Sequence, residues 1–155
     1  MSNKPTIFIG ADHGGFALKK HLAASLEKQG YTVCDQGTDS DASCDYPDFI
    51  FRTAEAVAHD AKSRGIVICT TGIGASICAN KVAGARASLC VNTDQAVMTR
   101  RHNDANVLAL GAKYVTPADA EAIVAAWLNE PFEGGRHQRR IDKITAYEKK
   151  GSCDR

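Results

Sequence analysis

The sequence predicts a single α/β domain in which helices cover both faces of a five-stranded parallel sheet. Short β-branched apolar runs alternate with segments of helical periodicity along the whole chain, and the connections between successive runs are too long for hairpins. The length of 155 residues suits one domain with a substantial core, and no repeat, low-complexity tract or linker divides it. We therefore expect residues 1–155 to form one domain.

Each expected strand is a short apolar run that ends at a glycine or a polar loop. The clearest is Gly65-Ile66-Val67-Ile68-Cys69, whose uninterrupted apolar character is typical of a parallel strand buried on both faces. The expected strands cover residues 6–10, 31–34, 65–69, 86–91 and 106–110.

The expected helices repeat apolar residues at three- and four-residue spacing. Gly30 ends the first, Asp94 or Thr93 caps the fourth, and Thr116-Pro117 opens the fifth by a cap followed by a proline. The helices cover residues 16–29, 49–63, a segment ending near 82, 94–102, 117–127 and 137–149. Residues 36–48 are predicted to form a long loop, and residues 150–155 a tail.

Composition removes several classes of function. The formal net charge is +1 and charged residues make up 24% of the chain, which gives no case for a nucleic-acid binder or a polybasic membrane protein. The amino-terminal sequence lacks the apolar stretch of a signal peptide, and no segment approaches the roughly 20 apolar residues that span a bilayer. We expect a cytoplasmic protein with no nucleic-acid or membrane partner.

The six cysteines are expected to be free thiols in a reducing compartment. They contain no C-x-x-C pair, which argues against a structural zinc site and a thioredoxin-type redox site. Cys69 differs from the others because it ends a buried strand and immediately precedes a glycine-rich turn, where a thiolate is favoured. The remaining positions predict core residues at Cys34, Cys78 and Cys90, a loop residue at Cys44 and a tail residue at Cys153.

Parallel sheets bind ligands at the carboxyl ends of their strands, near the point where the strand order reverses. Asp12 and His13 follow the first strand, Cys69 and the turn of residues 70–76 follow the third, and Lys113 follows the fifth. We expect these groups to converge. The N–H groups of the turn suit an anion, because the turn leads into a helix.

Three specific interpretations of this turn fail on particular residues. A Walker loop needs a Gly-Lys pair followed by Ser or Thr, which is absent, and a dinucleotide fingerprint has its third glycine position occupied by Ile77. A cysteine phosphatase needs an arginine soon after its cysteine, but the next arginine after Cys69 is Arg86. Farther along, Arg136 and Arg140 share one helix face, so they are either a solvated charge run or a pair that holds a phosphate.

Several motifs taken together resemble the ribose-5-phosphate isomerase type B family, which includes relatives that act on allose 6-phosphate and galactose 6-phosphate. The resemblance runs from about residue 7 to residue 148. The motifs are Gly10-Ala11-Asp12-His13-Gly14-Gly15-Phe16, Asp45-Tyr46-Pro47, Cys69-Thr70-Thr71-Gly72-Ile73-Gly74, Ala79-Asn80-Lys81, His102-Asn103-Asp104-Ala105-Asn106-Val107 and Gly134-Gly135-Arg136-His137.

The resemblance implies a Rossmann-like, doubly wound five-stranded domain with no metal or organic cofactor. It implies a homodimer with active sites at the subunit interface and a sugar phosphate as the bound partner, and it leaves open whether dimers pair into tetramers. The implied reaction interconverts an aldose phosphate and a ketose phosphate through a cis-enediolate.

Residue roles follow from the same resemblance. Cys69 matches the base that moves a proton between the first two carbons of the sugar, and Thr71 matches its companion hydroxyl. His102 matches the residue that opens the furanose ring, with assistance from Asp12. The matched substrate contacts are Asp12, His13, Tyr46, Thr70, Thr71, Gly72, Ile73, Gly74, Ser76, Asn103, Lys113, Arg136 and Arg140.

Two positions depart from the family pattern. Thr70 stands where relatives commonly carry glycine, and Lys113 stands where many carry an arginine that helps to bind phosphate, so a planar fork becomes a point charge. The stretch Ala75-Ser76-Ile77 carries no acid, which assigns the chain to the members that use cysteine as the base.

The function expected from the sequence is the interconversion of D-ribose 5-phosphate and D-ribulose 5-phosphate in the non-oxidative pentose phosphate route. One alternative is an isomerase of a hexose 6-phosphate such as allose 6-phosphate. A second, from another class, is a non-catalytic module that binds a nucleotide or a phosphosugar.

Overall fold

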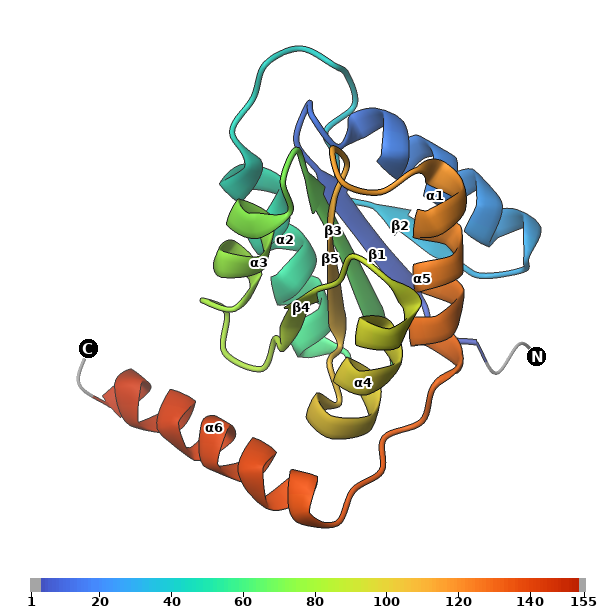
Figure 1. The fold of residues 1–155 in the computed structure, drawn as a ribbon. Coiled ribbons are helices and arrows are strands. Elements are labelled where there is room, and N and C mark those ends of the chain that lie inside the picture. The colour runs from blue at the N-terminus through green and yellow to red at the C-terminus, as the bar shows by residue number, and fades with distance from the viewer. Residues whose placement is uncertain (1–3, 154–155) are drawn as a thin grey trace.

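Five parallel strands form the centre of the molecule, in the order β2-β1-β3-β5-β4 (Figure 1). The structure is a computed structural model that describes residues 4–153, with side chains described as far as residue 151. The strands are β1 (Ile7–Ala11), β2 (Val33–Asp35), β3 (Arg64–Cys69), β4 (Ala87–Leu89) and β5 (Val107–Gly111). The predicted fold, a doubly wound Rossmann-like α/β domain with a five-stranded parallel sheet, is confirmed.

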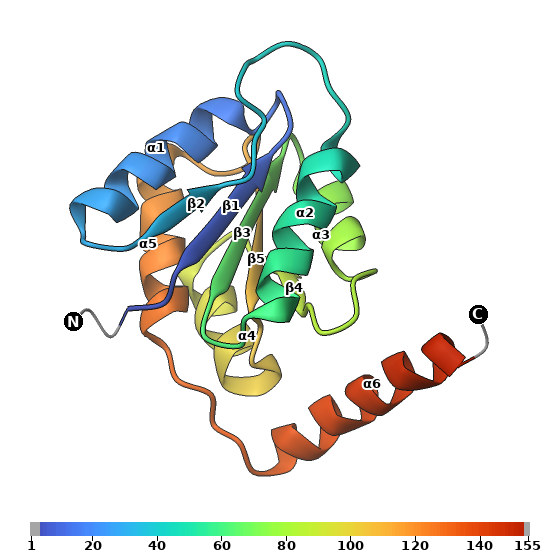
Figure 2. The same cartoon turned by 180° about the vertical axis from the view of Figure 1, so that it is seen from behind.

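Helices cover both faces of this sheet, as Figures 1 and 2 show from opposite sides. One face carries α1 (Phe16–Lys28), α4 (Thr93–Asn103) and α5 (Pro117–Asn129), and the other carries α2 (Tyr46–His59) and α3 (Ile73–Ala79). The last helix, α6 (Arg136–Cys153), lies apart from both layers and makes few contacts with the rest of the chain.

The central strand β3 shows why the chain folds this way. Its side chains alternate between two buried clusters, with Ile66 and Ile68 on the side of α1 and α5 and with Val67 and Cys69 on the side of α2 and α3. All four are buried, so the strand contributes apolar area to both layers and has no solvated face. The end of β3 is therefore anchored from both sides.

Several helix boundaries differ from those predicted. Helix α2 begins at Tyr46, with Pro47 in its first turn, and ends at His59, so the predicted loop is shorter than expected. Helix α3 ends at Ala79 because the Asn80 amide turns to the backbone of Ala87, donating to its oxygen and accepting from its nitrogen at 2.9 Å.

The cap of α4 and the carboxyl end of α6 also differ from the predictions. Asn92, not Asp94 or Thr93, caps α4, because its side chain accepts the N–H of Gln95 at 2.9 Å. The predicted tail is also wrong in part: α6 continues past residue 149 to Cys153, and residues 154 and 155 lie outside the described part of the chain. No helix within residues 4–153 is both long enough and apolar enough to cross a membrane.

Candidate active site

The strand order reverses between β1 and β3, and the carboxyl ends of these neighbours carry Asp12 and Cys69. The backbone N–H of Asp12 donates to the oxygen of Ile68 at 3.3 Å, which ties the two strand ends together. The Asp12 side chain is only 6% exposed, and its Oδ1 accepts the N–H of Gly15 at 3.0 Å. A buried carboxylate thus lies in a fixed position beside the end of β3.

Cys69 is 4% exposed, and its Sγ accepts the N–H of Gly72 at 3.2 Å. This contact requires the left-handed backbone of Gly72, which has φ of +75°. A Cβ on Gly72 would lie 2.7 Å from the nitrogen of Gly111 and 2.5 Å from Cδ1 of Leu89. Only glycine lets the turn pass this close to the end of β5 and direct its N–H at the sulfur.

The turn that follows Cys69 gathers further predicted residues. The Thr71 hydroxyl accepts the N–H of Ile73 at 3.4 Å. The backbone carbonyl oxygen of Thr70 accepts the N–H of Lys113 at 2.9 Å. Tyr46, in the first turn of α2, packs against Gly74, where an added Cβ would lie 2.7 Å from the ring carbon Cζ. The structure therefore brings Asp12, Tyr46, the turn of residues 70–74 with Ser76 behind it, and Lys113 to one edge of the sheet.

His13 follows Asp12 at the same edge and is exposed. Its Nδ1 lies 3.2 Å from the nitrogen and 3.1 Å from the oxygen of Cys44 in the long loop. Which ring nitrogen carries the proton decides which of these contacts is the hydrogen bond. The imidazole connects the loop to the edge of the sheet in either case.

The other described cysteines are free and do not share the position of Cys69. Burial raises the pKa of Cys90 to about 11, and burial followed by the nearby Cys69 raises the pKa of Cys78, so both behave as core residues. Cys34 is half-buried on the edge strand β2, and its prediction as a core residue is wrong. The side chain of Cys153 lies outside the described residues.

His102, Asn103, Arg136 and Arg140 form a second group at the opposite end of the sheet (Figure 1). Helix α4 ends at Asn103, and after three intervening residues the chain enters β5, whose last residue, Gly111, pairs with Cys69. The four residue steps of β5 separate these two edges by about 13 Å. Within one chain His102 therefore lies at the other edge of the sheet from Cys69, because α4 runs antiparallel to the strands and returns to their amino ends.

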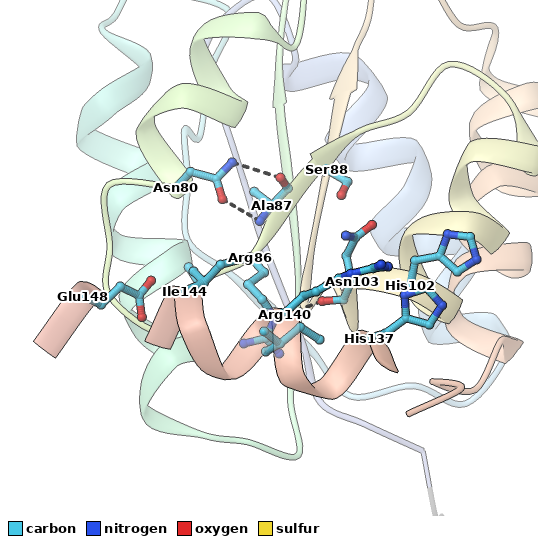
Figure 3. A pocket seen from close by; sticks show the side chains of 12 residues that line it. Asn80, Arg86, Ala87, Ser88, His102, Asn103, His137, Arg140, Ile144 and Glu148 are labelled. Atoms are coloured by element: carbon cyan, nitrogen blue, oxygen red, sulfur yellow. Dashed lines mark hydrogen bonds between the residues drawn. The ribbon is translucent and has the colours of Figure 1, made fainter. Parts of the chain in front are cut away.

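Three members of this second group, His102, Asn103 and Arg140, line a cleft of about 640 Å³ between α6, β4 and the end of α4 (Figure 3). Arg140 is exposed at its rim, and Arg136 is exposed one turn earlier on α6. The turn that carries Asn103 is held firmly, since Arg86 Nε donates to the Asn103 oxygen at 3.0 Å. Asp104 closes the helix in a left-handed conformation, with φ of 45°, and pairs with Arg100 at 2.8 Å.

His137 also lines this cleft and is not among the site residues predicted from the sequence. His137 stacks on His102, with ring centroids 4.3 Å apart and ring planes 15° from parallel. It belongs to the Gly134-Gly135-Arg136-His137 motif, in which the sequence predicts a phosphate contact for Arg136 and no role for His137. His137 is buried by its contact with α4, and the spacing of residues within α6 does not predict a contact with a different helix.

Among residues 4–151, the ligand atoms of His102, Glu133 and His137 lie within 4.8 Å of one another, as a metal site would require. The stacked rings do not fit an ion, because parallel rings direct their in-plane lone pairs side by side instead of toward one point. The guanidinium groups of Arg136 and Arg140 also act on His137. The absence of a metal or organic cofactor stays a prediction.

Comparisons with known proteins agree with this geometry. The sequence pattern of the Ribose/Galactose Isomerase family matches residues 7–144. Ribose-5-phosphate isomerase B of Escherichia coli strain K12 is 47% identical over 144 residues, covering 93% of this chain and 97% of the relative. The solved structure of ribose-5-phosphate isomerase B from Clostridium thermocellum has a TM-score of 0.91 at 53% identity, and the match covers 94% of this chain and 98% of that chain. The enzyme of Mycoplasma genitalium, solved with bound ribulose 5-phosphate, has a TM-score of 0.90 at 46% identity, and the match covers 93% of this chain and 96% of that chain. The chain belongs to the ribose/galactose isomerase family and is an isomerase.

Proposed function

We propose that this enzyme interconverts D-ribose 5-phosphate and D-ribulose 5-phosphate through a cis-enediolate. The observation that carries the proposal is the Cys69 thiol, held beneath the N–H of Gly72 at the edge where the strand order reverses. The relative from Mycoplasma genitalium, which has the same fold, binds ribulose 5-phosphate. Membership of an isomerase family also removes the non-catalytic binding module as an alternative.

The proposed proton transfer uses the carboxyl edge. Cys69 as thiolate takes the proton from C2 of the open aldose, which leaves an enediolate with negative charge on the oxygen of C1. The backbone N–H groups of residues 70–74 stabilise that charge, and Thr71 supplies a hydroxyl beside the two oxygens. A proton then passes from the hydroxyl on C2 to the oxygen of C1, with the Thr71 hydroxyl as the relay, so that the negative charge moves to the oxygen of C2. The thiol returns its proton to C1 as the carbonyl forms at C2, which completes the ketose without any external oxidant or reductant.

Ring opening requires the second group of residues. His102 would donate a proton to the ring oxygen, with Asp12 assisting, but a general acid must approach within about 3 Å of the atom it protonates. The two edges of one chain are too far apart for His102 and Cys69 to act on one sugar. We therefore propose that a second copy of the chain brings its His102 and Asn103 to the first copy's Cys69, so that a dimer contains two complete sites.

Phosphate binding follows the same division. Arg136 and Arg140 from one copy supply cationic contacts, and His13 from the other copy supplies a ring N–H. Lys113 at the carboxyl edge is a further charge. Both arginines are exposed in the single chain, as groups that bind a ligand against a partner should be.

The direct test is an isomerase assay on purified protein. We expect conversion of ribose 5-phosphate without added metal, and a fall in kcat of about a hundredfold or more in Cys69→Ala. Cys78→Ala changes a thiol packed nearby and is the matched control, with activity close to wild type. Full activity in Cys69→Ala would contradict the assigned base.

The shared site is tested by mixing two inactive variants. In Cys69→Ala and His102→Asn homodimers, both sites are damaged, but a mixed dimer has one site in which both residues are intact. Random exchange of equal amounts should restore about a quarter of wild-type activity. Recovery of no activity, with mixed dimers shown to form, would place both residues in one chain's site.

Hexose 6-phosphates are the alternative substrates. The Thr70 hydroxyl fills the space beside Gly14, where an added Cβ would lie 2.1 Å from it. Threonine stands here where relatives commonly carry glycine, and its extra volume would favour the shorter sugar. We expect a higher kcat/KM on ribose 5-phosphate than on allose 6-phosphate, and the reverse order would assign the hexose.

A further inference from the structure

A small cleft lies at the amino ends of the strands, at the opposite end of β3 from Cys69. It has a volume of about 240 Å³. Val57, Ala58 and Ala61, at the end of α2 and just after it, give the cleft an apolar lining. Arg64, the first residue of β3, and Arg86, just before β4, bring two guanidinium groups to it. Pockets for drug-sized ligands hold about 300–1,000 Å³, so this cleft suits a smaller ligand.

Three arginines around this cleft share one carboxylate. Asp104 pairs with Arg100 at 2.8 Å and with Arg86 at 3.3 Å. Arg64 has no carboxylate partner within residues 4–151, and its side chain makes one hydrogen bond there, from Nη1 to the backbone oxygen of Ser63 at 2.8 Å. Positive charge therefore exceeds negative charge in this cluster.

The protein environment disfavours the charge on Arg64. Burial and then Arg100 lower the pKa of Arg64, Asp104 opposes them, and Arg86 adds to the lowering. A negative ion beside Arg64 would offset this, because opposite charges stabilise each other most where water is partly excluded. Donors remain for such an ion, since no acceptor among the described residues is bound to Nη2 of Arg64 or to Nη1 of Arg86.

Arg86 connects this cleft to the candidate site. It also lines the larger cleft of His102 and Asn103 (Figure 3), and its Nε holds the Asn103 oxygen at 3.0 Å. The N–H of Gly84 is already bound by Oε2 of Glu148 at 3.1 Å, so side chains and not this backbone group are the donors. An ion on Arg86 would therefore contact the side chain that holds the turn after α4.

We propose that the cleft at Arg64 and Arg86 binds a small oxyanion of the size and charge of phosphate, at a site separate from the one that holds the sugar phosphate. Arginine suits such an ion because its planar fork presents two N–H groups to two oxygens. The volume fits a single ion and not a nucleotide. The proposal concerns binding alone, so it does not depend on which sugar the enzyme isomerises.

Isothermal titration calorimetry with inorganic phosphate tests the site without turnover. Arg140→Ala removes a proposed contact to the substrate's phosphate, so the binding that remains in this variant reports the cleft. Adding Arg64→Gln should lower the remaining affinity about tenfold or more, because a charge-assisted contact is lost.

Lys62→Gln is the matched control. It removes the same charge from an exposed side chain that does not line the cleft, and should change the affinity of the Arg140→Ala protein by less than about twofold. An unchanged affinity with Arg64→Gln, or an equal loss with both substitutions, would overturn the proposal.

Melting temperatures show in addition whether the variants fold. Because the fold disfavours the charge of Arg64, Arg64→Gln without phosphate should be at least as stable as the wild type, yet gain less stability when phosphate is added. Ala61→Glu places a carboxylate on an exposed residue that lines the cleft, and should reduce the response to phosphate in the same way. A full response in both variants would contradict an ion in this cleft.

Amide NMR spectra of Arg140→Ala locate the ion. Phosphate should shift the signals of Gly84, Arg86 and Asp104, which line the cleft or hold its arginines. Shifts confined to residues 70–74 would place the ion at the carboxyl edge and overturn the proposal.

Discussion

The two groups of site residues differ in how the chain supports them. At the carboxyl edge, Cys69 and Asp12 are buried between helix layers and held by backbone contacts. At the other end, Arg136 and Arg140 are exposed on a helix that the domain hardly covers. A base must be fixed to a fraction of an ångström, so it belongs on the end of a core strand. Side chains that bind phosphate can stand on an exposed helix, provided that a second copy of the chain covers them when the substrate is bound.

The largest contrast is expected between two glycines with left-handed backbone, one in each group. Gly72→Ala places a Cβ 2.7 Å from the nitrogen of Gly111, so we expect a loss of about 3 kcal/mol or more in the free energy of unfolding, and loss of activity. Gly135 has φ of +56° but nothing within 4 Å of an added Cβ. Gly135→Ala should cost only about 1 kcal/mol. Chemical denaturation measures both, and equal losses would show that the two ends are supported alike.

The exposed helix should affect substrate binding and leave stability unchanged. Arg140→Ala should raise KM for ribose 5-phosphate about ten- to a hundredfold, because a charge-assisted contact to phosphate is lost, with little change in melting temperature. Arg139→Ala changes the neighbouring exposed arginine on a different face of α6 and should leave KM near wild type. The assignment of Arg140 fails if KM is unchanged, or if both variants behave alike.

A smaller effect should separate packing from chemistry at the carboxyl edge. Gly14→Ala brings a Cβ to 2.1 Å from the Thr70 hydroxyl, which must move, at a cost of about 1–3 kcal/mol in the free energy of unfolding. Thr70→Gly removes that neighbour, so the double variant should recover most of the loss. If Gly14→Ala costs the same in both backgrounds, Thr70 is not what limits this position.

The sequence predicts one of these groups much better than the other. Strand β3 is an uninterrupted apolar run, and parallel topology alone places Asp12 and Cys69 at neighbouring strand ends. The start of α2 is harder to predict, because the Gly-, Ser- and Asp-rich sequence before it favours a loop that includes Tyr46-Pro47, although proline suits the first turn of a helix.

The second group depends on contacts that are distant along the chain. The position of His102 follows from the direction of α4 across the sheet, and its neighbour His137 comes from a helix 34 residues later. Nothing in helical spacing distinguishes a stacked, buried histidine from a solvated one. The extension of α6 through Gly151 to Cys153 was missed for a related reason, since composition there favours a tail.

The smallest expected effect concerns a core thiol that the chemistry does not use. Burial raises the pKa of Cys90 from the ordinary 9.0 to about 11. Between these values the unfolded chain loses the thiol proton and the folded chain keeps it, so stability falls as the pH rises through this window. Cys90→Ala removes that contribution, and the variant should lose less free energy of unfolding than the wild type between pH 7 and pH 10.5, measured by urea denaturation. An equal loss in both proteins would mean that Cys90 ionises as easily in the fold as in the unfolded chain.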